Sequence, residues 1–582
     1  MINSSIATKI QSASNETVSP DNINQLQQHL NCSNIFAQLL DKRGLKVETV
    51  NAFLNPVLAD LSDPSNLKDL DRAVERIIQA VKNNEKIAVY GDYDVDGVTG
   101  SFVLQETFNI LKLPLIVHIP HRTRDGYGIQ QATLEKLQAE GVSVVISVDC
   151  GVRAFEPLVW AKNNGMDIII TDHHQPDGDS LPDAYALINP HRNDCDAEME
   201  SLTGVGVAFK LAHALLRKSK YSANLDDHLR SLLPFVALGM IADMTSLVGE
   251  ARALVKIGFN EIYRTKNFGL QALCDLCLDG AELSSSDVGF KLAPRINAAG
   301  RLGEAQLVLD LLNAQNPEEA RSFAIELDAI NDARRAIQDD VVKQAEAQAF
   351  EQIAKNGGEV PSFFVLSGQH WHRGVVGIVA ARITNQFERP ALVFCEEDGI
   401  LYGSGRSFAK FPLLEALESV AELFTTFGGH QMACGATLPV QNLAALRAGI
   451  ESFANSCDPE VYLDTTPEFE LEIGSQHLSL SLAQELKLLE PFGLNNREPV
   501  FASTFEIDGA PRVLKEKHLK FALTAKQQAD DIAALWWNSA EEHQDTDWEE
   551  ADEVSANFKL QTNTWRGKTS IQLILNSLVI VA

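Results

Sequence analysis

Short apolar runs alternate with amphipathic stretches along the chain from Lys86 onward. Apolar runs of about five residues predict buried strands, while apolar positions three and four apart predict helices that pack against them. This alternation is typical of a parallel sheet with both faces covered. We predict strands at 87–91, 114–118, 143–148, 167–171 and 185–189, and helices at 99–111, 130–140 and 154–164.

The pattern changes on either side of this α/β region. Residues 1 to about 80 contain amphipathic segments and predict helices. Asn316-Pro317 predicts the start of a long helix, because Asn is a good N-cap and Pro fits the first helical position. Such a helix is too long to pack within one domain, so we expect it to connect two domains. Two shorter helices with a break near Asn331 are the alternative.

A second α/β unit and an all-β region follow this connector. The runs SFFVLSG, PALVFC and LYGSGRS predict strands with helices between them. Later runs, such as PVFASTFEI, IAALWWN and TSIQLILNSLVIV, predict five or so strands, which suit a small barrel. We therefore predict an α/β multidomain protein. Its parts are a helical N-terminal region (1–80), a parallel-sheet domain (81–315), a connector helix (316–356), a second α/β domain (357–460) and a β-barrel (461–582).

Acidic and histidine side chains follow three of the predicted strands at their carboxyl ends, where ligands bind in open parallel sheets. Carboxylates this close together repel one another unless they are protonated or neutralised by metal. If strand alternation continued, the acids of the first run would share one side, whereas the two neighbouring histidines would point in opposite directions. The residues are Asp92, Asp94 and Asp96, then Asp149, then Asp172, His173 and His174.

This mixture of carboxylate and imidazole groups favours Mn²⁺ or Mg²⁺ over structural zinc. Two such ions can clamp a phosphoryl centre, so the pattern indicates metal-assisted hydrolysis. Asp243 ends the apolar stretch PFVALGMIAD and would be costly to bury unpaired, so we expect it to join the cluster. A simple helix-terminus acid is the alternative for Asp243. A calcium loop is not favoured for DYDVDG, because its twelfth position is Val103 rather than Glu.

The charge balance limits where a nucleic acid could bind. The chain has 49 basic and 79 acidic residues, a net charge of −30, which at face value argues against such a partner. However, ten acids and no Lys or Arg lie between Gln527 and Glu553, a stretch that predicts a solvated loop. We therefore expect nucleic acid to bind in a groove, with this acidic stretch lying away from it.

Three features bear on location and on cofactors. No apolar run reaches the roughly 18 residues of a membrane-spanning helix, and the polar N-terminus does not resemble a signal peptide. The eight cysteines are scattered, which suits a reducing compartment. We expect a soluble, cytoplasmic protein without a membrane partner. The segment GVGVAFK lacks the GK[ST] ending of a P-loop, so its glycines indicate close packing at a helix start rather than ATP binding.

Nine short motifs, taken in order over most of the chain, resemble the DHH phosphoesterase superfamily and, within it, the RecJ family of single-stranded-DNA-specific exonucleases. They are YGDYDVDGVTG, VDCGV, TDHH, LGMIADMTSL, APRINAAGRLG, HWHRGVVGIVAARI, GSGRS, GGHQMACG and EPFGLNNREPVF. The resemblance implies a DHH catalytic domain, a DHHA1-like second domain and an OB-like barrel. It also implies 5′-to-3′ hydrolysis of single-stranded DNA to mononucleotides, in DNA repair and recombination, with two Mn²⁺ or Mg²⁺ ions.

The resemblance also implies roles for individual residues. His174 would contact the scissile phosphate or position the nucleophile, and Asp172 would orient a histidine. The metal ligands would be Asp92, Asp94, Asp96, Asp149, His173 and Asp243, with bridging and outer roles left open among the first three. Nucleic acid would meet Arg122, Tyr127, Arg295, Asn297, Arg301, His372, Arg373, Ser404, Arg406 and His430. Helix-end pairing is the alternative for the 295–301 residues, and simple turns for the glycine-adjacent ones.

Two other functions remain open. One is a DHH phosphodiesterase acting on cyclic dinucleotides or short oligonucleotides, which would need little beyond the two α/β domains. The other is a non-catalytic replication factor on the same fold, which would predict broken metal ligands. The barrel tryptophans Trp536, Trp537, Trp548 and Trp565 favour DNA, because OB folds stack bases on aromatic rings. We expect a monomer, and we consider a single-strand-binding protein and a helicase as further partners.

Overall fold

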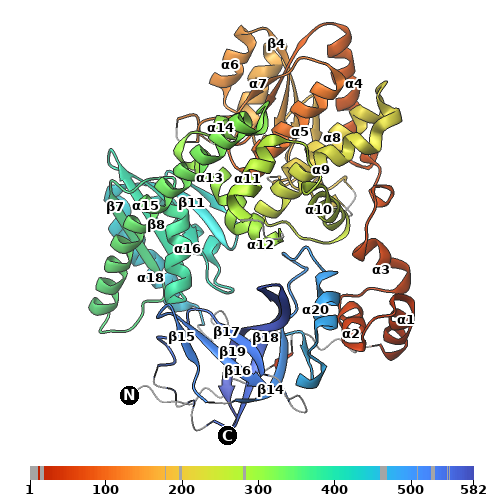
Figure 1. Cartoon of the computed structure of the whole chain (residues 1–582). Helices are drawn as coiled ribbons and strands as arrows, with labels where there is room; N and C mark the ends of the chain where they lie inside the picture. Colours follow the sequence, from red (N-terminus) through yellow and green to blue (C-terminus); the bar gives the residue numbers. More distant parts are fainter. Residues whose placement is uncertain are drawn as a thin grey trace. The chain divides into compact units, whose positions relative to one another are not determined.

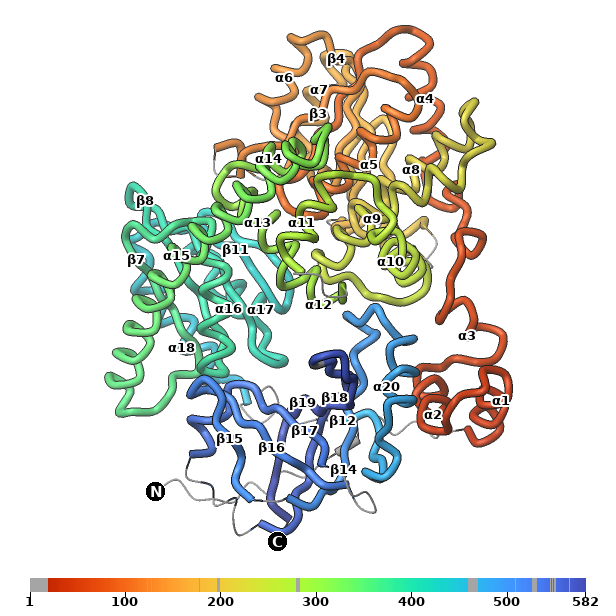
Figure 2. The backbone as a smooth tube through the Cα atoms, viewed as in Figure 1, coloured from red at the N-terminus to blue at the C-terminus, as the bar shows by residue number. Residues whose placement is uncertain are grey.

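Figure 1 and Figure 2 show the computed structural model of the chain. The chain forms two compact units. Unit 1 comprises Met1–Asp63, Met244–Glu261 and Thr466–Ala582, and unit 2 comprises Pro64–Asp243 and Ile262–Thr465. The residues described are 11–12, 19–122, 124–126, 128–176, 178–195, 199–278, 283–458, 468–507, 509–525, 531–544, 546, 548 and 551–581.

A five-stranded parallel sheet forms the first part of unit 2. Its strand order is β3-β2-β4-β5-β6, and every neighbouring pair is parallel. Runs of Val and Ile fill the central strands, whose side chains are buried on both faces, as expected for a covered parallel sheet. The five predicted strands are confirmed, as β2 (Lys86–Tyr90), β3 (Ile116–His118), β4 (Val142–Val148), β5 (Asp167–Thr171) and β6 (Ala186–Ile188).

Helices cover both faces of this sheet. On one face, Leu134, Leu137 and Leu158 join the core that the strands form with α6 and α7. Outside this core, α5 packs against α8 and α9, and the ring centroids of Phe102 and Phe235 lie 4.6 Å apart. The helices are α4 (Leu70–Lys82), α5 (Val95–Leu111), α6 (Gln131–Ala139), α7 (Phe155–Asn163), α8 (Gly204–Arg217) and α9 (Leu225–Ala242).

A single long helix, α15 (Pro317–Lys355), connects the two halves of unit 2. Its 39 residues span roughly 58 Å at 1.5 Å per residue. The Asn316 side chain caps it by accepting a bond from the Glu319 N–H at 2.9 Å. The helix runs unbroken through the buried Asn331, so the prediction of one connector is confirmed and the alternative of a break there is wrong. Shorter helices precede it: α11 (Phe268–Leu278), α12 (Ser285–Asp287), a π-helical turn (Val288–Leu292), α13 (Ala293–Leu302) and α14 (Gln306–Leu312).

The second half of unit 2 is a mixed sheet with the order β10-β11-β9-β8-β7. β7 and β8 are parallel and the other pairs are antiparallel. α15 and α16 pack on one side of it, while α17 and α18 pack on the other. The elements are β7 (Phe364–Gln369), α16 (Val376–Phe387), β8 (Ala391–Glu397), β9 (Ile400–Arg406), α17 (Leu413–Glu418), β10 (Thr426–Gly429), β11 (Ala433–Pro439) and α18 (Leu443–Ser456).

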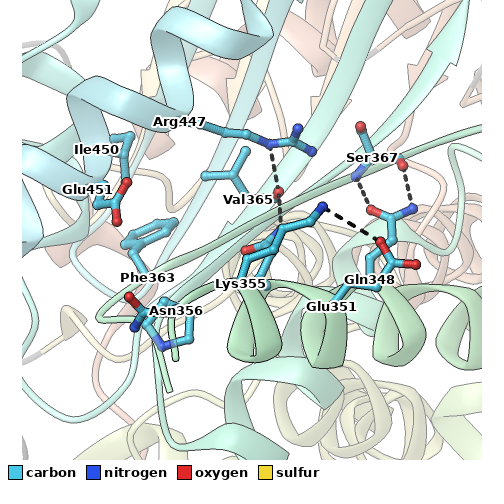
Figure 3. Close-up of a pocket in the computed structure, with 12 residues that line it drawn as sticks. Gln348, Glu351, Lys355, Asn356, Phe363, Val365, Ser367, Arg447, Ile450 and Glu451 are labelled. Carbon is cyan, nitrogen blue, oxygen red and sulfur yellow. Dashed lines mark hydrogen bonds and ion pairs between the residues drawn. The ribbon is translucent and has the colours of Figure 1, made fainter. Parts of the chain in front are cut away.

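Side chains cover the outer edge of β7, in a pocket of about 660 Å³ that Figure 3 shows. Gln348 of α15 donates to the Ser367 carbonyl at 2.8 Å and accepts from the Ser367 N–H at 3.2 Å. Arg447 of α18 donates to the Val365 carbonyl at 3.2 Å. An exposed strand edge invites pairing with another chain, and these side chains occupy the groups that would pair.

The C-terminal strands of unit 1 close into a five-stranded barrel. The ladder runs β14-β18-β19-β17-β16, and a further pairing of β14 with β16 closes the ring. Only β17 and β19 pair in parallel within the ring, and this order is that of an OB fold, so the predicted OB-like barrel is confirmed. The strands are β14 (Phe501–Ile507), β16 (His518–Thr524), β17 (Asp531–Trp536), β18 (Glu553–Trp565) and β19 (Lys568–Ile580), with β13 (Leu471–Glu472) and β15 (Arg512–Leu514) at the edges.

Helices from distant parts of the chain complete unit 1. Phe36 and Leu40 of α2 are buried in one core with Leu486 of α20 and Phe501 of the barrel. The predicted N-terminal helical region therefore contributes to both units, because α1–α3 join unit 1 and α4 joins unit 2. The helices are α1 (Pro20–Leu30), α2 (Asn34–Lys42), α3 (Val47–Leu54), α10 (Gly249–Ile262) and α20 (Leu480–Lys487), and a short pairing joins β1 (Gln11–Ser12) to β12 (Glu468–Phe469).

Two further sequence predictions concern the whole chain. Within the described ranges, no helix is both long enough and apolar enough to span a bilayer. The acidic stretch 527–553 lies partly outside the described residues. Its described part begins with β17, a barrel strand, so the prediction of a solvated loop is wrong for those residues. The reason is the apolar run IAALW, which is buried along one face of the strand.

Candidate metal centre and phosphate pocket

The three acids of the first motif lie where β2 turns into α5. Asp94 is the N-cap of α5 and accepts a bond from the Gly97 N–H at 3.0 Å. Asp96 lies in the first turn of the helix and is 1% exposed. β2 ends at Tyr90, so the expectation that strand alternation would align the acids is wrong. The turn into the helix brings them together instead.

Asp96 is bonded to the N-terminus of a second helix, α8. Its carboxylate accepts bonds from the Gly204 N–H at 2.6 Å, the Val205 N–H at 3.0 Å and the Thr203 hydroxyl at 2.7 Å. Helix N-termini favour negative charge, so α8 stabilises this carboxylate. A Cβ on Gly204 would lie 2.4 Å from the Cβ of Asp149. Glycine at this helix start is therefore required for close packing, as the sequence indicates.

Asp149 follows β4 in a left-handed conformation, with φ of +61°. The Asp149 N–H donates to the Thr171 carbonyl at 2.9 Å, which fixes the turn against β5. The side chain is buried, and its Oδ1 lies 3.1 Å from Nε2 of His173. His173 Nε2 also lies 3.7 Å from Oδ2 of Asp243, the residue that caps the C-terminus of α9. His173 therefore lies between two acids from different elements.

Asp172 organises the two histidines. Its Oδ1 accepts bonds from the N–H groups of His173 at 2.7 Å and His174 at 3.1 Å, and from Nδ1 of His174 at 2.8 Å. The two imidazole rings lie with centroids 4.7 Å apart, and both reach toward Asp149. The expectation that they point in opposite directions is wrong, because β5 ends at Thr171 and the main chain turns around the Asp172 carboxylate.

Burial and like charge shift the pKa values of the cluster. Burial and neighbouring acids raise the pKa of Asp92 and of Asp149 well above the usual range. Asp243 has a side chain that is 32% exposed, and partial desolvation with the charges of Asp96 and Asp94 raises its pKa to about 8. The two histidines diverge. Burial lowers the pKa of His173 to about 3, whereas for His174 burial is outweighed by the bond to Asp172, which raises its pKa to about 9.

These residues fit divalent cations. Oδ1 of Asp92 and Oδ1 of Asp149 are buried and accept no hydrogen bond within the described part of the chain. Buried oxygens of this kind, beside several like charges, are stabilised by a cation. The structure brings all six predicted ligands together, with His174 beside them. The groups whose ligand atoms lie within 4.8 Å of one another are Asp149-His173-His174, Asp96-His173-Asp243 and Asp92-Asp94-Asp149.

An arginine-lined pocket of about 590 Å³ adjoins this cluster through Tyr93, which lies between Asp92 and Asp94 in sequence. We call it the arginine pocket and define it by Arg122, Arg301, Arg373, Ser404 and Arg406. It lies within unit 2 and takes residues from both halves of that unit.

The arginines of the pocket are held in place by neighbouring groups. The Arg122 guanidinium lies 4.8 Å from the Tyr93 ring centroid, and that of Arg373 lies 4.0 Å from the Tyr402 ring centroid. Arg301 donates to the Gly374 carbonyl at 2.8 Å. Burial and the neighbouring arginines lower the pKa of Arg301 to about 10, so the pocket is a site where an anion would be stabilised.

Among the described residues, the other predicted nucleic-acid contacts, Arg295, Asn297, His372 and His430, do not line the pocket. Arg295 forms an ion pair with Asp328 at 2.8 Å, which matches the helix-end alternative. Asn297 is half-buried on α13, and Nδ1 of His372 accepts a bond from the Gly374 N–H at 3.0 Å. His430 is exposed in the turn between β10 and β11. Tyr127 lies outside the described residues.

Sequence reasoning missed the aromatic and small residues of this pocket. Tyr93, Tyr402 and Phe427 line it beside the arginines. The position of Tyr93 inside the DYDVDG motif was the available signal. Gly300 is a second one, since a Cβ there would lie 2.2 Å from the Tyr93 carbonyl oxygen. Because of this close approach, the residue before Arg301 lies against the turn that carries Asp92 and Asp94.

Three family models match the chain in the order of its domains. They are the DHH family N-terminal domain over residues 86–240, the DHHA1 domain over 361–456 and the RecJ OB domain over 469–577. Together with the acid and histidine cluster, these matches define the class as a phosphoesterase of the DHH type with an added OB barrel.

Similar proteins specify the family. The chain is 34% identical over 565 residues to the single-stranded-DNA-specific exonuclease RecJ of Bacillus subtilis, covering 95% of this chain and 69% of the relative. It is 34% identical over 543 residues to that of Dickeya dadantii, covering 90% and 92%. The crystal structure of Thermus thermophilus RecJ with Mn²⁺ matches with a TM-score of 0.82 at 28% identity, covering 97% and 79%. The chain therefore belongs to the RecJ family, and the predicted resemblance and multidomain fold are confirmed.

Proposed function

We propose that this protein is a divalent-metal-dependent exonuclease that hydrolyses single-stranded DNA from the 5′ end to mononucleotides, in DNA repair and recombination. One observation carries the proposal: a carboxylate and histidine cluster suited to Mn²⁺ or Mg²⁺ adjoins a pocket lined by arginines, with Tyr93 joining the two. The cluster supports phosphodiester hydrolysis, and the pocket supports a phosphate-bearing substrate.

The residues that would hold two ions are Asp92, Asp94, Asp149, His173 and Asp243. Asp96 supports the site from outside, because both of its oxygens are bonded to the start of α8. When bound, the ions neutralise the carboxylates and activate water for attack on phosphorus. Main-chain hydrogen bonds in the turns after β2, β4 and β5 hold these residues in position.

His174 and Asp172 act on the substrate as a pair. Asp172 accepts from Nδ1 of His174 and keeps the imidazole protonated at neutral pH. The charged ring donates a hydrogen bond from Nε2 to an oxygen of the scissile phosphate. This contact strengthens as negative charge develops in the transition state, so it lowers the barrier rather than only binding DNA.

The arginine pocket holds the terminal phosphate. Guanidinium groups donate paired hydrogen bonds to phosphate oxygens. Because neighbouring groups hold these arginines in place, less conformational entropy is lost when a phosphate binds. The volume of about 590 Å³ lies in the range of small-ligand sites. Because the pocket adjoins the cluster, a terminal phosphate bound there lies near the phosphodiester bond that is hydrolysed. This arrangement favours release of one nucleotide at a time.

The barrel supplies further contacts for a long strand. Trp537 is half-exposed and its ring lies 4.8 Å from that of His518. Exposed aromatic rings on OB folds stack bases without reading sequence. A cyclic-dinucleotide phosphodiesterase would not need this barrel, so that alternative is not favoured. We further propose a cytoplasmic monomer that works with a single-strand-binding protein and a helicase.

A test of polarity and substrate uses one oligonucleotide labelled at either end. With Mn²⁺, the 5′-labelled strand should release labelled mononucleotide at once, while the 3′ label should appear in small products only at late times. EDTA should abolish both. A duplex and a dinucleotide serve as comparison substrates and should turn over more slowly. Early release of the 3′ label would overturn the polarity, and preferred turnover of the dinucleotide would overturn the substrate class.

A further inference from the structure

The segment that follows Asp243 belongs to unit 1, although Asp243 itself belongs to unit 2. The boundary between the compact units falls between Asp243 and Met244. Met244 is 76% exposed and has φ of +58°, a left-handed conformation that costs a non-glycine residue roughly 1 kcal/mol. The proposed metal ligand is thus joined directly to a piece of chain that is held by the contacts of the other unit.

Main-chain and side-chain bonds fasten that piece to the loop before β14. The Leu247 N–H donates to the Leu494 carbonyl at 2.9 Å, and the Asn495 amide donates to the Ser246 hydroxyl at 2.9 Å. Leu247 is buried, and a Cβ on Gly493 would lie 2.7 Å from its side chain. Residues 246–247 therefore have little freedom relative to this loop.

Arg252, in the first turn of α10, adds further bonds to this loop and to α3. It is 1% exposed and donates to the main-chain carbonyls of Phe53 at 3.0 Å, Glu490 at 3.2 Å and Pro491 at 3.3 Å. Its guanidinium lies 3.7 Å from the centroid of the Phe53 ring. Lys256, one turn later, donates to the Leu488 carbonyl at 3.2 Å. Burial of a charged group among neutral carbonyls costs free energy. The planar guanidinium group of Arg252 donates in fixed directions, so its bonds fix the orientation of the side chain as well as its distance from the carbonyls.

We propose that Arg252 is a positioning residue for Asp243. Arg252 holds α10 to the loop 488–496 and so fixes one end of the segment 244–248. Because the other end of this segment is joined to Asp243, Arg252 influences the position of the Asp243 carboxylate. The three carbonyls that accept hydrogen bonds from Arg252 all lie within unit 1, so its influence on the metal centre passes through residues 244–248. The inference rests on the proposed role of Asp243 as a metal ligand.

Calorimetric titration of the full chain with Mn²⁺, without DNA, tests this in a double-mutant cycle. The variants are Arg252→Met, which keeps an unbranched apolar side chain and removes its hydrogen bonds, Asp243→Asn, and both together. Arg252→Met should weaken Mn²⁺ binding by about three- to tenfold, at or below the 10–100-fold typical of groups that support a ligand. It should add nothing in the Asp243→Asn background, because both changes act on one ligand.

Two controls separate positioning from general destabilisation. Arg252→Lys keeps the charge but replaces the planar guanidinium fork with one compact ammonium group, so it should restore Mn²⁺ affinity only in part. Arg76→Met removes another buried arginine, paired with Glu85 and Asp167 at the opposite end of the parallel sheet. This control should lower the melting temperature and leave Mn²⁺ affinity unchanged.

The outcomes are distinct. If Asp243→Asn leaves Mn²⁺ affinity unchanged, the ligand assignment itself fails and the inference fails with it. If Asp243→Asn weakens binding but Arg252→Met does not, only the positioning role is overturned. Equal losses from Arg252→Met in both backgrounds, or an equal loss from Arg76→Met, would also overturn it, since the effect would then be independent of Asp243.

Discussion

The acid cluster and the arginine pocket are opposite in charge and alike in construction. In the cluster, burial raises the pKa values of Asp92 and Asp149, and in the pocket burial lowers that of Arg301. Each region holds like charges together by packing and by bonds to the main chain. Each is therefore stabilised by an ion of opposite charge, a metal cation in one and a phosphate in the other.

This comparison explains how a chain of net charge −30 can bind an anion. The charges are sorted locally, so the overall balance does not describe the field in the pocket. The difference also predicts a division of labour. Changes in the cluster should lower the rate of the chemical step, whereas changes in the pocket should weaken substrate binding.

The largest effect is expected for Asp149→Asn. This variant alters a buried carboxylate whose Oδ1 accepts no hydrogen bond from the residues that the structure describes, and the change should disrupt the metal centre. We expect kcat to fall by about 10³-fold, since metal ions contribute several kcal/mol to such reactions. The rate of mononucleotide release at saturating single-stranded DNA checks this. The control Asp183→Asn removes an exposed acid paired with Lys162 and should leave kcat unchanged.

A smaller loss should follow Asp172→Asn. The amide no longer holds His174 protonated, so the pKa of His174 should fall and its bond to the scissile phosphate should weaken. Groups that orient a functional side chain typically contribute about 10–100-fold, and we expect a loss in kcat of that size. NMR titration of the His174 ring gives the matching readout. A His174 pKa that stays near 9 in the variant would contradict this role for Asp172.

Arg406→Gln should affect KM more than kcat. Arg406 bonds to Ser404 and faces the arginine pocket, so the variant loses a charged contact to phosphate. A hydrogen bond to a charged group contributes about 1.5 kcal/mol, which corresponds to a rise in KM of roughly tenfold. Arg295→Gln is the matched control, because that arginine pairs with Asp328 and does not line the pocket. An equal rise in KM for both variants would show that the pocket has no special role.

The smallest effect is expected for Trp537→Ala in the barrel. Loss of one exposed stacking ring should weaken binding of a long strand by about 1 kcal/mol, or roughly fivefold. Binding of a very short oligonucleotide should be unchanged. Fluorescence anisotropy with labelled strands of two lengths measures both. Equal loss for short and long strands would argue against a role of the barrel in length preference.

Much of the fold could be predicted because it depends on local patterns. Runs of Val and Ile beside amphipathic stretches are sufficient to predict the five parallel strands, and Asn316-Pro317 is sufficient for the start of α15. The composition of the two units could not be predicted in this way. Phe36 and Phe501 belong to one core although more than four hundred residues separate them, and no local pattern predicts that they share it.

The candidate site shows the same distinction between features that depend on local sequence and features that depend on three-dimensional contacts. The acids after β2, β4 and β5 were predictable from their places at strand ends. The shared direction of His173 and His174 was not, because it depends on the turn around Asp172 rather than on strand geometry. Arg295 resembles Arg301 in sequence context, yet only Arg301 lines the pocket, since Asp328 of α15 engages Arg295.

The division of labour between the acid cluster and the arginine pocket is tested most directly by one set of steady-state curves. Release of mononucleotides from a single-stranded oligonucleotide is measured for the parent protein, Asp149→Asn and Arg406→Gln at saturating Mn²⁺. We predict that Asp149→Asn loses kcat with KM little changed, and that Arg406→Gln shows the reverse. Loss of the same parameter in both variants would contradict the account.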